Sequence, residues 1–310
     1  MESAWFAGVA ERPKGRTARM GLLGLPSLSQ TLSPGRLFDL RSLQTRPRRD
    51  NQRQIRQLCA NAYLGDHTSL CRVLGRYKMF VDTRDVGLAT HLLLDGFWEM
   101  WLTEALSAAV KPGMVVADIG ANLGYYSLLM ADLVEAGGVV HAFEPNPAIA
   151  DLMWKSCDVN GFGDRVRLHR DPLGCEDGKP VGLIVPAAEP KNAHVTPHLD
   201  APGAIALTTR RFDAIPDLLD VDVVKIDAEA AEYDIWRGMS GRLDRTDKPL
   251  TIFMEFASTR YEDPDGFLAE VEARGFALAV VTLDDGVEPR TRQQILAAPA
   301  LVDQMLVLTR

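Results

Sequence analysis

The chain has 310 residues, a formal net charge of −8 at pH 7 and a pI near 5.3. Its length suits one α/β domain with an N-terminal extension better than two equal domains. The negative charge argues against general binding of nucleic acids or anionic membranes, which requires a basic field. The four cysteines form no C-x-x-C pair and no apolar run reaches about eighteen residues. We therefore expect no thiolate metal site, no transmembrane segment and a cytoplasmic location.

Residues 1–56 differ in composition from the rest of the chain. They contain eleven Lys and Arg against four Asp and Glu, with scattered Gly, Pro and Ser. This composition is typical of a poorly ordered or loosely docked extension, although it could also attract an acidic partner. We expect a basic N-terminal extension over residues 1–56, a cap region over residues 57–110 and the main domain over residues 111–310.

The cap region shows mainly helical patterns. Apolar side chains at helical spacing predict one helix over residues 51–64 and a longer one over residues 91–109, with a strand over residues 77–81 between them. Residues 111–113, Lys-Pro-Gly, end the second helix. A helix-rich cap above the sheet could close over a ligand, and Glu99 is the acid best placed to face it, although a helical glutamate is more usually solvated.

The stretch from Met114 to Asn160 contains the strongest pattern, which reads as strand, glycine turn, helix, strand and second helix. The first apolar run ends on Asp118, and the second ends on Glu144, just before two prolines. Open α/β sheets bind their ligands at the carboxyl ends of such strands, so both acids are candidate ligand contacts. The other reading is a plain βαβ core in which the acids only cap helices.

The two acids and the turn between them indicate what kind of ligand to expect. Glu144 can accept hydrogen bonds from both hydroxyls of a ribose, as the acid of the dinucleotide fingerprint does. The turn from Gly120 to Gly124 lacks the G-x-G-x-x-G spacing, and Asp118 beside it would repel a pyrophosphate. Asp118 would attract a ligand that carries ammonium and sulfonium charges, and S-adenosylmethionine is such a ligand. A nicotinamide-dependent oxidoreductase is therefore disfavoured.

A third strand is predicted over residues 166–169, and Asp171 falls in the loop that follows it. If the ribose lies on Glu144, this loop is near the adenine, and Asp171 could accept a hydrogen bond from the adenine amino group. An aspartate that forms a turn before Pro172 is an equally good interpretation.

Residues 174–210 are less regular, with only a weak strand predicted over residues 181–185. His194 and His198 are four positions apart, but Pro197 between them and the lack of a helical pattern argue against a metal site. Loops over a rigid sheet commonly select substrates, so we interpret this segment as a substrate-facing insertion.

Residues 221–227 predict a buried strand in which Lys225 interrupts an apolar run. A buried lysine must be paired or shift its pKa. Asp227 follows two positions later and projects from the same side of the strand. Glu229 stands at the start of the next helix, where an acid can also simply complement the helix dipole. A divalent ion between Asp227 and Glu229 is left open, since hard oxygen ligands suit Mg²⁺.

The C-terminal part predicts a fifth strand over residues 250–254, a helix over residues 265–274 and strands over residues 276–283 and 304–309. Because no long helix separates the last two strands, we expect them to be antiparallel. The sheet should finish in this hairpin-like pair.

Together these motifs resemble the FkbM family of S-adenosylmethionine-dependent methyltransferases. The matching stretches extend over about residues 80–285 in the family's order; they are VVADIGANLGYYSLL, VVHAFEPNP, residues 212–219, VVKIDAEAAEYDIWRGM and IFMEF. The resemblance implies the class I methyltransferase fold, which is a Rossmann-like, seven-stranded, mostly parallel sheet with an antiparallel last strand. Residues 111–310 would form this domain, preceded by a helical N-terminal extension. A homodimer is also implied.

One position departs from the family pattern K-I-D-x-E-G-x-E, because Ala230 stands where the family has glycine. If that glycine allows a left-handed backbone, Ala230 would strain the loop. If the residue is helical, alanine is favourable. A catalytically weak or inactive binding module is therefore the alternative to an enzyme.

By matching position, the resemblance implies which residues bind the cofactor and which face the acceptor. The cofactor contacts would be the turn, Asp118 behind it and the ribose-binding acid, that is Asp118, Gly120, Asn122, Gly124 and Glu144. Asp171 is added to these contacts from its place in the loop after the third strand. The expected reaction is methyl transfer to a hydroxyl of a sugar, glycan or natural product. Such a hydroxyl must lose its proton, and a positioned general base typically contributes about 10²- to 10⁴-fold. Asp227 is the first choice for this base and Glu229 the second, while Lys225 would orient Asp227 or bind an acceptor oxygen.

Overall fold

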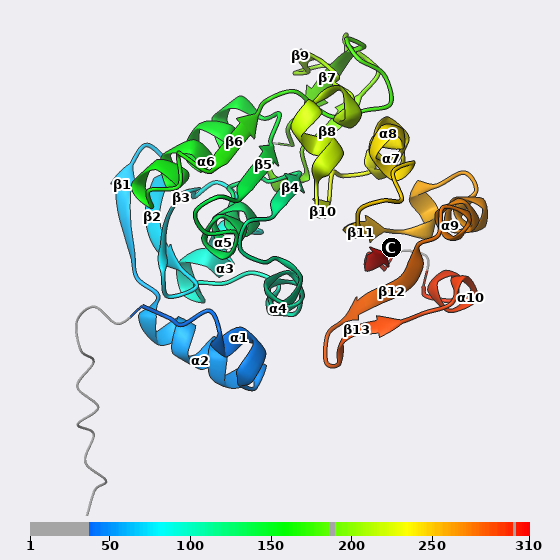
Figure 1. Ribbon diagram of the computed structural model, residues 1–310. Coiled ribbons are helices and arrows are strands. Elements are labelled where there is room, and N and C mark those ends of the chain that lie inside the picture. Colours follow the sequence, from blue (N-terminus) through cyan, green and yellow to red (C-terminus); the bar gives the residue numbers. More distant parts are fainter. Residues whose placement is uncertain (1–36, 187–189, 300–301) are drawn as a thin grey trace, which may run out of the picture. The chain divides into compact units, whose positions relative to one another are not determined.

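The computed structural model describes residues 37–186, 190–299 and 302–310, and Figure 1 shows its elements. The first 36 residues of the predicted basic extension lie outside this part. Within the described residues, the central feature is an eight-stranded sheet. In spatial order its strands are β13 (Gly286–Pro289), β12 (Ala277–Thr282), β14 (Gln304–Thr309), β11 (Thr251–Phe256), β10 (Val223–Ile226), β4 (Val115–Ile119), β5 (Val139–Phe143) and β6 (Val166–His169).

Most of this sheet is parallel. The five neighbouring strands from β6 to β11 run in one direction, and β14 runs antiparallel to both of its neighbours, β11 and β12. The predicted mostly parallel sheet with a reversed last strand is confirmed. The predicted count of seven strands is one too low for the described part of the chain. Gly286, with φ of 79°, turns the chain back so that β13 pairs with β12 at the sheet edge.

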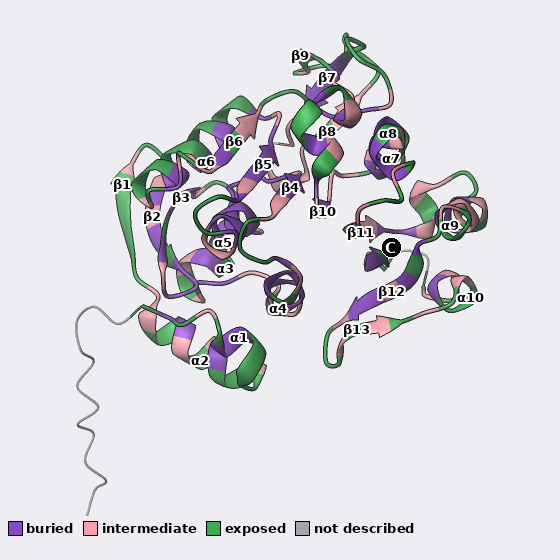
Figure 2. Ribbon diagram, in the orientation of Figure 1, coloured by how far each residue is buried: buried purple, intermediate pink, exposed green. Residues whose placement is uncertain are grey.

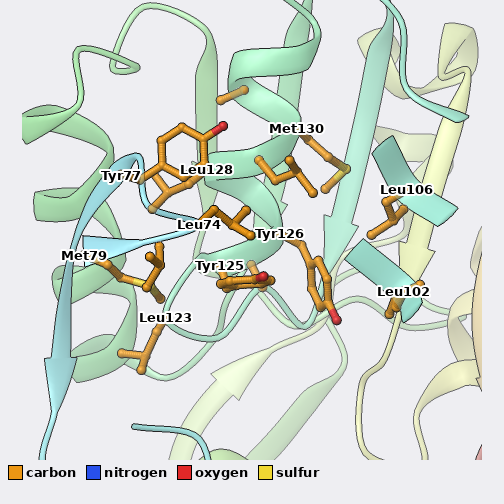
Figure 3. Close-up of a cluster of buried hydrophobic side chains, with 14 of the residues drawn as sticks. Leu74, Tyr77, Met79, Leu102, Leu106, Leu123, Tyr125, Tyr126, Leu128 and Met130 are labelled. Carbon is orange, nitrogen blue, oxygen red and sulfur yellow. The ribbon is translucent and has the colours of Figure 1, made fainter. Parts of the chain in front are cut away.

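Each face of the sheet has its own apolar layer, because side chains alternate along a strand. In β4, Val116 packs into one layer and Ala117 into the other. Buried sides of helices complete each layer. They include α4 (Met100–Ala109), α5 (Tyr125–Leu133) and α6 (Pro147–Val159) in the first layer, and α7 (Glu232–Gly238), α9 (Pro264–Ala273) and α10 (Arg292–Leu296) in the second. The short α8 (Ser240–Leu243) follows α7. Figure 2 shows the buried positions along the strands, and Figure 3 shows the first layer around Tyr125 and Tyr126.

Residues 37–110 form a layer of helices and strands, in which the strand predicted over residues 77–81 is confirmed. The helices α1 (Ser42–Thr45) and α2 (Arg48–Leu58) precede a three-stranded antiparallel sheet of β1 (Asn61–Gly65), β2 (Thr68–Val73) and β3 (Tyr77–Asp82). The helix predicted over residues 51–64 is wrong beyond Leu58, because Gly65, Asp66 and His67 have positive φ and fold β1 back onto β2. The predicted extension boundary at residue 56 falls inside α2. The Phe80 N–H of β3 donates to Ser156 Oγ of α6 over 2.9 Å, so this layer joins the first apolar layer.

The helix predicted over residues 91–109 is broken in two. α3 (Ala89–Leu94) ends before Gly96, whose φ is 74°, and α4 begins after Glu99, whose φ is 32°. Both φ values lie in the left-handed region, which redirects the chain between the two helices. Glu99 therefore precedes α4 instead of lying on the exposed surface of a continuous helix.

The insertion after β6 contains a second small antiparallel sheet. Its strands, in the order β8-β7-β9, are β8 (His194–Thr196), β7 (Pro180–Ile184) and β9 (Ile205–Thr208). The weak strand predicted over residues 181–185 is confirmed as β7. Short 3₁₀ turns lie beside the sheets at η1 (Pro190–Asn192), η2 (Phe212–Ala214), η3 (Pro216–Asp220) and η4 (Ser258–Arg260). None of the helices in the described ranges combines the length and the apolar character needed to cross a bilayer.

Candidate active site

A cavity of about 460 Å³ lies where β4, β5, β6, β10 and β11 end. This volume is within the range of about 300 to 1,000 Å³ typical of ligand pockets. Trp98 and Glu99 from the N-terminal layer and Lys191 and Val195 from the insertion complete its wall. The strand-end acids and the insertion, which the sequence separates widely, therefore meet at one site.

The turn after β4 has a backbone that only glycine allows at its first position. Gly120 has φ of 73°, and a Cβ on it would lie 1.8 Å from the Asp227 carbonyl oxygen. The Gly120 and Ala121 N–H groups donate to the Phe143 carbonyl, which fixes the turn against β5. Gly120 and Asn122 line the cavity, as predicted residues of the cofactor contact. Gly124, with φ of 89°, lies behind the turn, where a Cβ would meet the Met153 side chain.

Glu144 follows β5 and is nearly buried in the cavity wall. Its Oε2 accepts from the Asn122 N–H and its Oε1 from the Asn146 N–H, each over 2.8 Å. Burial raises the pKa of Glu144 to about 7, although these two N–H donors act to lower it. Each carboxylate oxygen keeps a second lone pair, so the group can accept from two neighbouring hydroxyls, as a ribose presents them.

Asp118 lies behind the turn instead of in the cavity wall. Its side chain is fully buried, and Ser127 Oγ donates to its Oδ2 over 2.5 Å. Its Oδ1 lies 3.6 Å from Lys225 Nζ. Burial raises the pKa of Asp118, while Lys225 and Ser127 act to lower it. Asp118 is thus a counter-ion of Lys225, and it acts on a ligand only through the field of this network.

Lys225 and Asp227 form the charged centre of the site. Lys225 Nζ lies 3.3 Å from Asp227 Oδ2 and donates to the Gly120 carbonyl over 3.1 Å. Burial by itself lowers the pKa of Lys225, but Asp227 and Asp118 outweigh this and raise it, so the lysine stays protonated. The Asp227 side chain is 30% exposed and lines the cavity. The predicted ion pair of Lys225 with Asp227 is confirmed.

Glu229 and Ala230 both adopt left-handed backbone conformations. Glu229 has φ of 50° and lines the cavity, where burial, followed by the nearby Asp227, raises its pKa. Ala230 has φ of 76° and precedes α7, which begins at Glu232. Ala230 is therefore not a helical residue. It strains the loop, because alanine occupies a left-handed backbone conformation that favours glycine.

Asp171 also lines the cavity, beside Pro172 and Leu173 in the loop after β6. The site therefore contains seven of the nine predicted residues in its wall, the exceptions being Asp118 and Gly124. The two histidines considered for a metal lie on or after β8, and His194 Nδ1 is 3.3 Å from the Asn192 carbonyl. No group of three or more His, Cys, Asp or Glu in the described ranges is arranged to hold a metal ion.

Several site residues were not predicted. Glu255 at the end of β11 lines the cavity and pairs with Arg260, which also lies 3.1 Å from Asp303 Oδ1. Burial, followed by the charge of Asp227, raises the pKa of Glu255 to about 8. Its position near a strand end was a usable signal, because the same rule identified the acids at the carboxyl ends of β4, β5 and β10. Arg260 and Asp303 gave no such signal.

The matched family covers the core of this site. Residues 118–278, just over half of the chain, match the family described as Methyltransferase FkbM domain. The chain belongs to this family. The match includes the turn from Gly120 to Gly124, Glu144 and the strand end with Asp227. The predicted family is confirmed, and with it the family's cofactor, S-adenosylmethionine.

This chain is also similar to methyltransferases whose names do not mention FkbM. The Protein-L-isoaspartate O-methyltransferase of Methanocella arvoryzae is 32% identical over 106 residues, which cover 33% of this chain and 56% of that protein. The chain spans between a fifth and about half of the length of the isoaspartate methyltransferases that it matches first. Methyltransferase 1 of Beauveria bassiana is 23% identical over 186 residues, or 53% of this chain and 73% of that protein. The solved Methyltransferase FkbM of Methylobacillus flagellatus KT is 14% identical, with a TM-score of 0.39 over 64% of this chain and 43% of that chain.

Proposed function

We propose that this protein transfers a methyl group from S-adenosylmethionine to a hydroxyl oxygen. The observation that supports this best is the Asp227 carboxylate, which faces the cavity beside the Gly120 turn and pairs with protonated Lys225. A carboxylate held in this way can act as a general base toward a hydroxyl. Family membership supports methyl transfer, and the choice of oxygen as the acceptor atom is our proposal.

The residues of the cavity fit the cofactor. Glu144 would bind the ribose hydroxyls with the lone pairs that its backbone partners leave open. Phe143 and Leu173 offer apolar surface to the adenine, and Asp171 would accept from its amino group. The turn that begins at Gly120 lines the cavity beside Asp227 and would contact the methionine part. When bound, S-adenosylmethionine supplies an electrophilic methyl group.

The protein's own part in the reaction is to position the acceptor and remove its proton. Asp227 would accept the hydroxyl proton, and Lys225 fixes the carboxylate at 3.3 Å. Such a base typically contributes about 10²- to 10⁴-fold. Alignment of the reacting atoms can contribute more, since effective molarities of 10⁵ M and above are known. Glu229 is the second candidate for the base.

The acceptor that we propose is a hydroxyl of a sugar, glycan or natural product. Trp98 lines the same cavity, as do Glu229 and Glu255, whose pKa values respond to the charge of Asp227. An aromatic face with hydrogen-bond acceptors around it suits a ring that carries hydroxyls. We also propose a homodimer, on family resemblance, which light scattering tests. A cytoplasmic location is proposed on cysteine usage, and cell fractionation tests it.

The substitution Asp227→Asn tests the general base. Labelled S-adenosylmethionine and extracts of the source organism first identify the acceptor, and turnover of that acceptor is then compared between variants. We expect Asp227→Asn to lower kcat by about 10²- to 10⁴-fold while calorimetry shows unchanged binding of S-adenosylhomocysteine. Asp234→Asn, on the half-exposed side of α7, is the matched control and should keep full turnover. Unchanged turnover of Asp227→Asn would remove this residue from the role.

The second candidate function is an S-adenosylmethionine-binding module with weak or no activity. The left-handed Ala230 favours it, because a strained loop next to Asp227 and Glu229 can misplace both acids. Thermal shifts with S-adenosylmethionine, S-adenosylhomocysteine and NAD, combined with the labelling experiment, separate the cases. Stabilisation by the first two ligands without any labelled product supports the module, and stabilisation by NAD alone contradicts both functions.

A further inference from the structure

Glu99 is a carboxylate that the break between α3 and α4 places in the cavity wall. Its backbone is left-handed, with φ of 32° and ψ of 67°, which is an unfavourable conformation for a glutamate. Hydrogen bonds hold this conformation, since the Glu99 carbonyl accepts from the Thr103 N–H over 2.9 Å and Thr103 Oγ1 donates to the Trp98 carbonyl over 3.0 Å. Such strained residues gather at functional sites, where the surrounding structure maintains them.

The side chain of Glu99 is partly buried and has one neutral hydrogen-bond partner. Tyr126 OH donates to its Oε2 over 2.8 Å. Among the described residues, no cationic side chain forms an ion pair with it: Lys225 pairs with Asp118 and Asp227, and Lys191 lies over the Trp98 ring. Burial raises the pKa of Glu99 and the charge of Asp227 adds to this effect, while the hydrogen bond from Tyr126 and the charges of Lys225 and Lys191 act to lower it. A partly buried carboxylate without an ion-pair partner is stabilised when a cation comes into direct contact with it.

Glu99 is connected through Tyr126 and Lys225 to Gly120, at the end of the turn away from the Asn122 N–H that Glu144 binds. Glu144 binds the Asn122 N–H, which marks the ribose position. Lys225 donates to the Gly120 carbonyl and lies 5.4 Å from the ring centre of Tyr126, the residue that binds Glu99. If the ribose lies on Glu144 as proposed, the methionine part of the cofactor would extend toward this group of residues. That part carries the cofactor's ammonium group.

We propose that Glu99 binds the α-ammonium group of the methionine part of S-adenosylmethionine. This role rests on the proposed function, because it requires the same ligand in the same cavity. Glu99 supplies a negative charge beside the turn that Asp118 and Asp227 do not offer, since Asp118 is buried behind the turn and Asp227 is paired with Lys225.

Two ligands that differ only at the methionine part test this inference. S-adenosylhomocysteine has the ammonium and carboxylate groups, whereas 5′-methylthioadenosine keeps the adenosine and sulfur and lacks both. Calorimetry measures both ligands on the full chain and on Glu99→Gln, which removes the charge and can still accept from Tyr126. We expect Glu99→Gln to weaken S-adenosylhomocysteine by about 10- to 100-fold, the usual effect of a hydrogen bond to a charged group. Binding of 5′-methylthioadenosine should change less than about twofold, which also shows that the variant is folded.

The matched control is Glu135→Gln, because Glu135 also has a left-handed backbone, with φ of 54°, but lies exposed after α5. It should leave both affinities unchanged. Equal weakening of both ligands by Glu99→Gln overturns the proposal in favour of a structural role, and no change in either overturns it in favour of a contact with the acceptor. If the unaltered protein binds neither ligand, the proposed function itself fails, and this outcome differs from the other two.

Discussion

The strain at Ala230 can be measured directly by replacing it with the family's glycine. A left-handed alanine costs about 1–2 kcal/mol relative to its ordinary backbone conformations, and Ala230 has φ of 76°. Glycine removes this cost, but it adds about 0.4–1 kcal/mol of conformational entropy to the unfolded chain. The net expectation is that Ala230→Gly stabilises the protein by about 1 kcal/mol. For a domain of this size, that raises Tm by about 2–4 °C.

Thermal unfolding followed by circular dichroism or calorimetry measures this shift. Ala108→Gly is the matched control, because Ala108 is exposed and helical within α4. It should lower stability by about 0.5–1 kcal/mol, the ordinary cost of glycine in a helix. The two substitutions are chemically identical and should act in opposite directions. A fall in Tm for Ala230→Gly similar to that of the control would refute the assignment of backbone strain to this position.

Two further predictions concern the cofactor site. The affinity for 5′-methylthioadenosine should rise about tenfold between pH 6 and pH 8, because the ionised form of Glu144 is the one that would bind the ribose and its pKa is about 7. Calorimetry at both pH values measures this rise. Glu144→Gln should remove the pH dependence of the affinity. Gly120→Ala should destabilise the turn by more than about 2 kcal/mol and abolish cofactor binding, since its Cβ would lie 1.8 Å from the Asp227 carbonyl oxygen. Urea unfolding and a thermal shift with S-adenosylhomocysteine measure the two effects, and a variant that binds normally would contradict the geometry.

The strand-end acids were predictable because their positions follow from chain topology. In a parallel sheet, the carboxyl ends of neighbouring strands meet at one edge, whatever their separation in sequence. Glu144, Asp171 and Asp227 therefore met in one cavity as expected. Glu255 lies at the carboxyl end of β11, next to its last residue, so the same rule applies to it. It lines the cavity, has a raised pKa and pairs with Arg260.

The break before α4 could not be predicted from periodicity. Apolar side chains keep helical spacing on both sides of it, so the pattern over residues 91–109 reads as one helix. The break depends on a distant partner, because the Leu74 N–H donates to the Gly96 carbonyl over 2.7 Å and fixes the left-handed turn. Glu99 was considered from sequence as a helical acid above the ligand. Only its backbone conformation shows why its side chain enters the cavity.

The role of Asp118 depends on strand register, which the sequence does not contain. β10 and β4 pair in parallel with Lys225 opposite Asp118, so both side chains lie on the same face of the sheet. The sequence indicated that Lys225 needed a partner and suggested Asp227. One partly exposed carboxylate does not fully offset the desolvation cost of a lysine that is 2% exposed. Asp118 supplies the second charge from inside the core. The lysine that fixes Asp227 therefore depends on Asp118. Under the proposed function, Asp118 would support the reaction without touching either reactant.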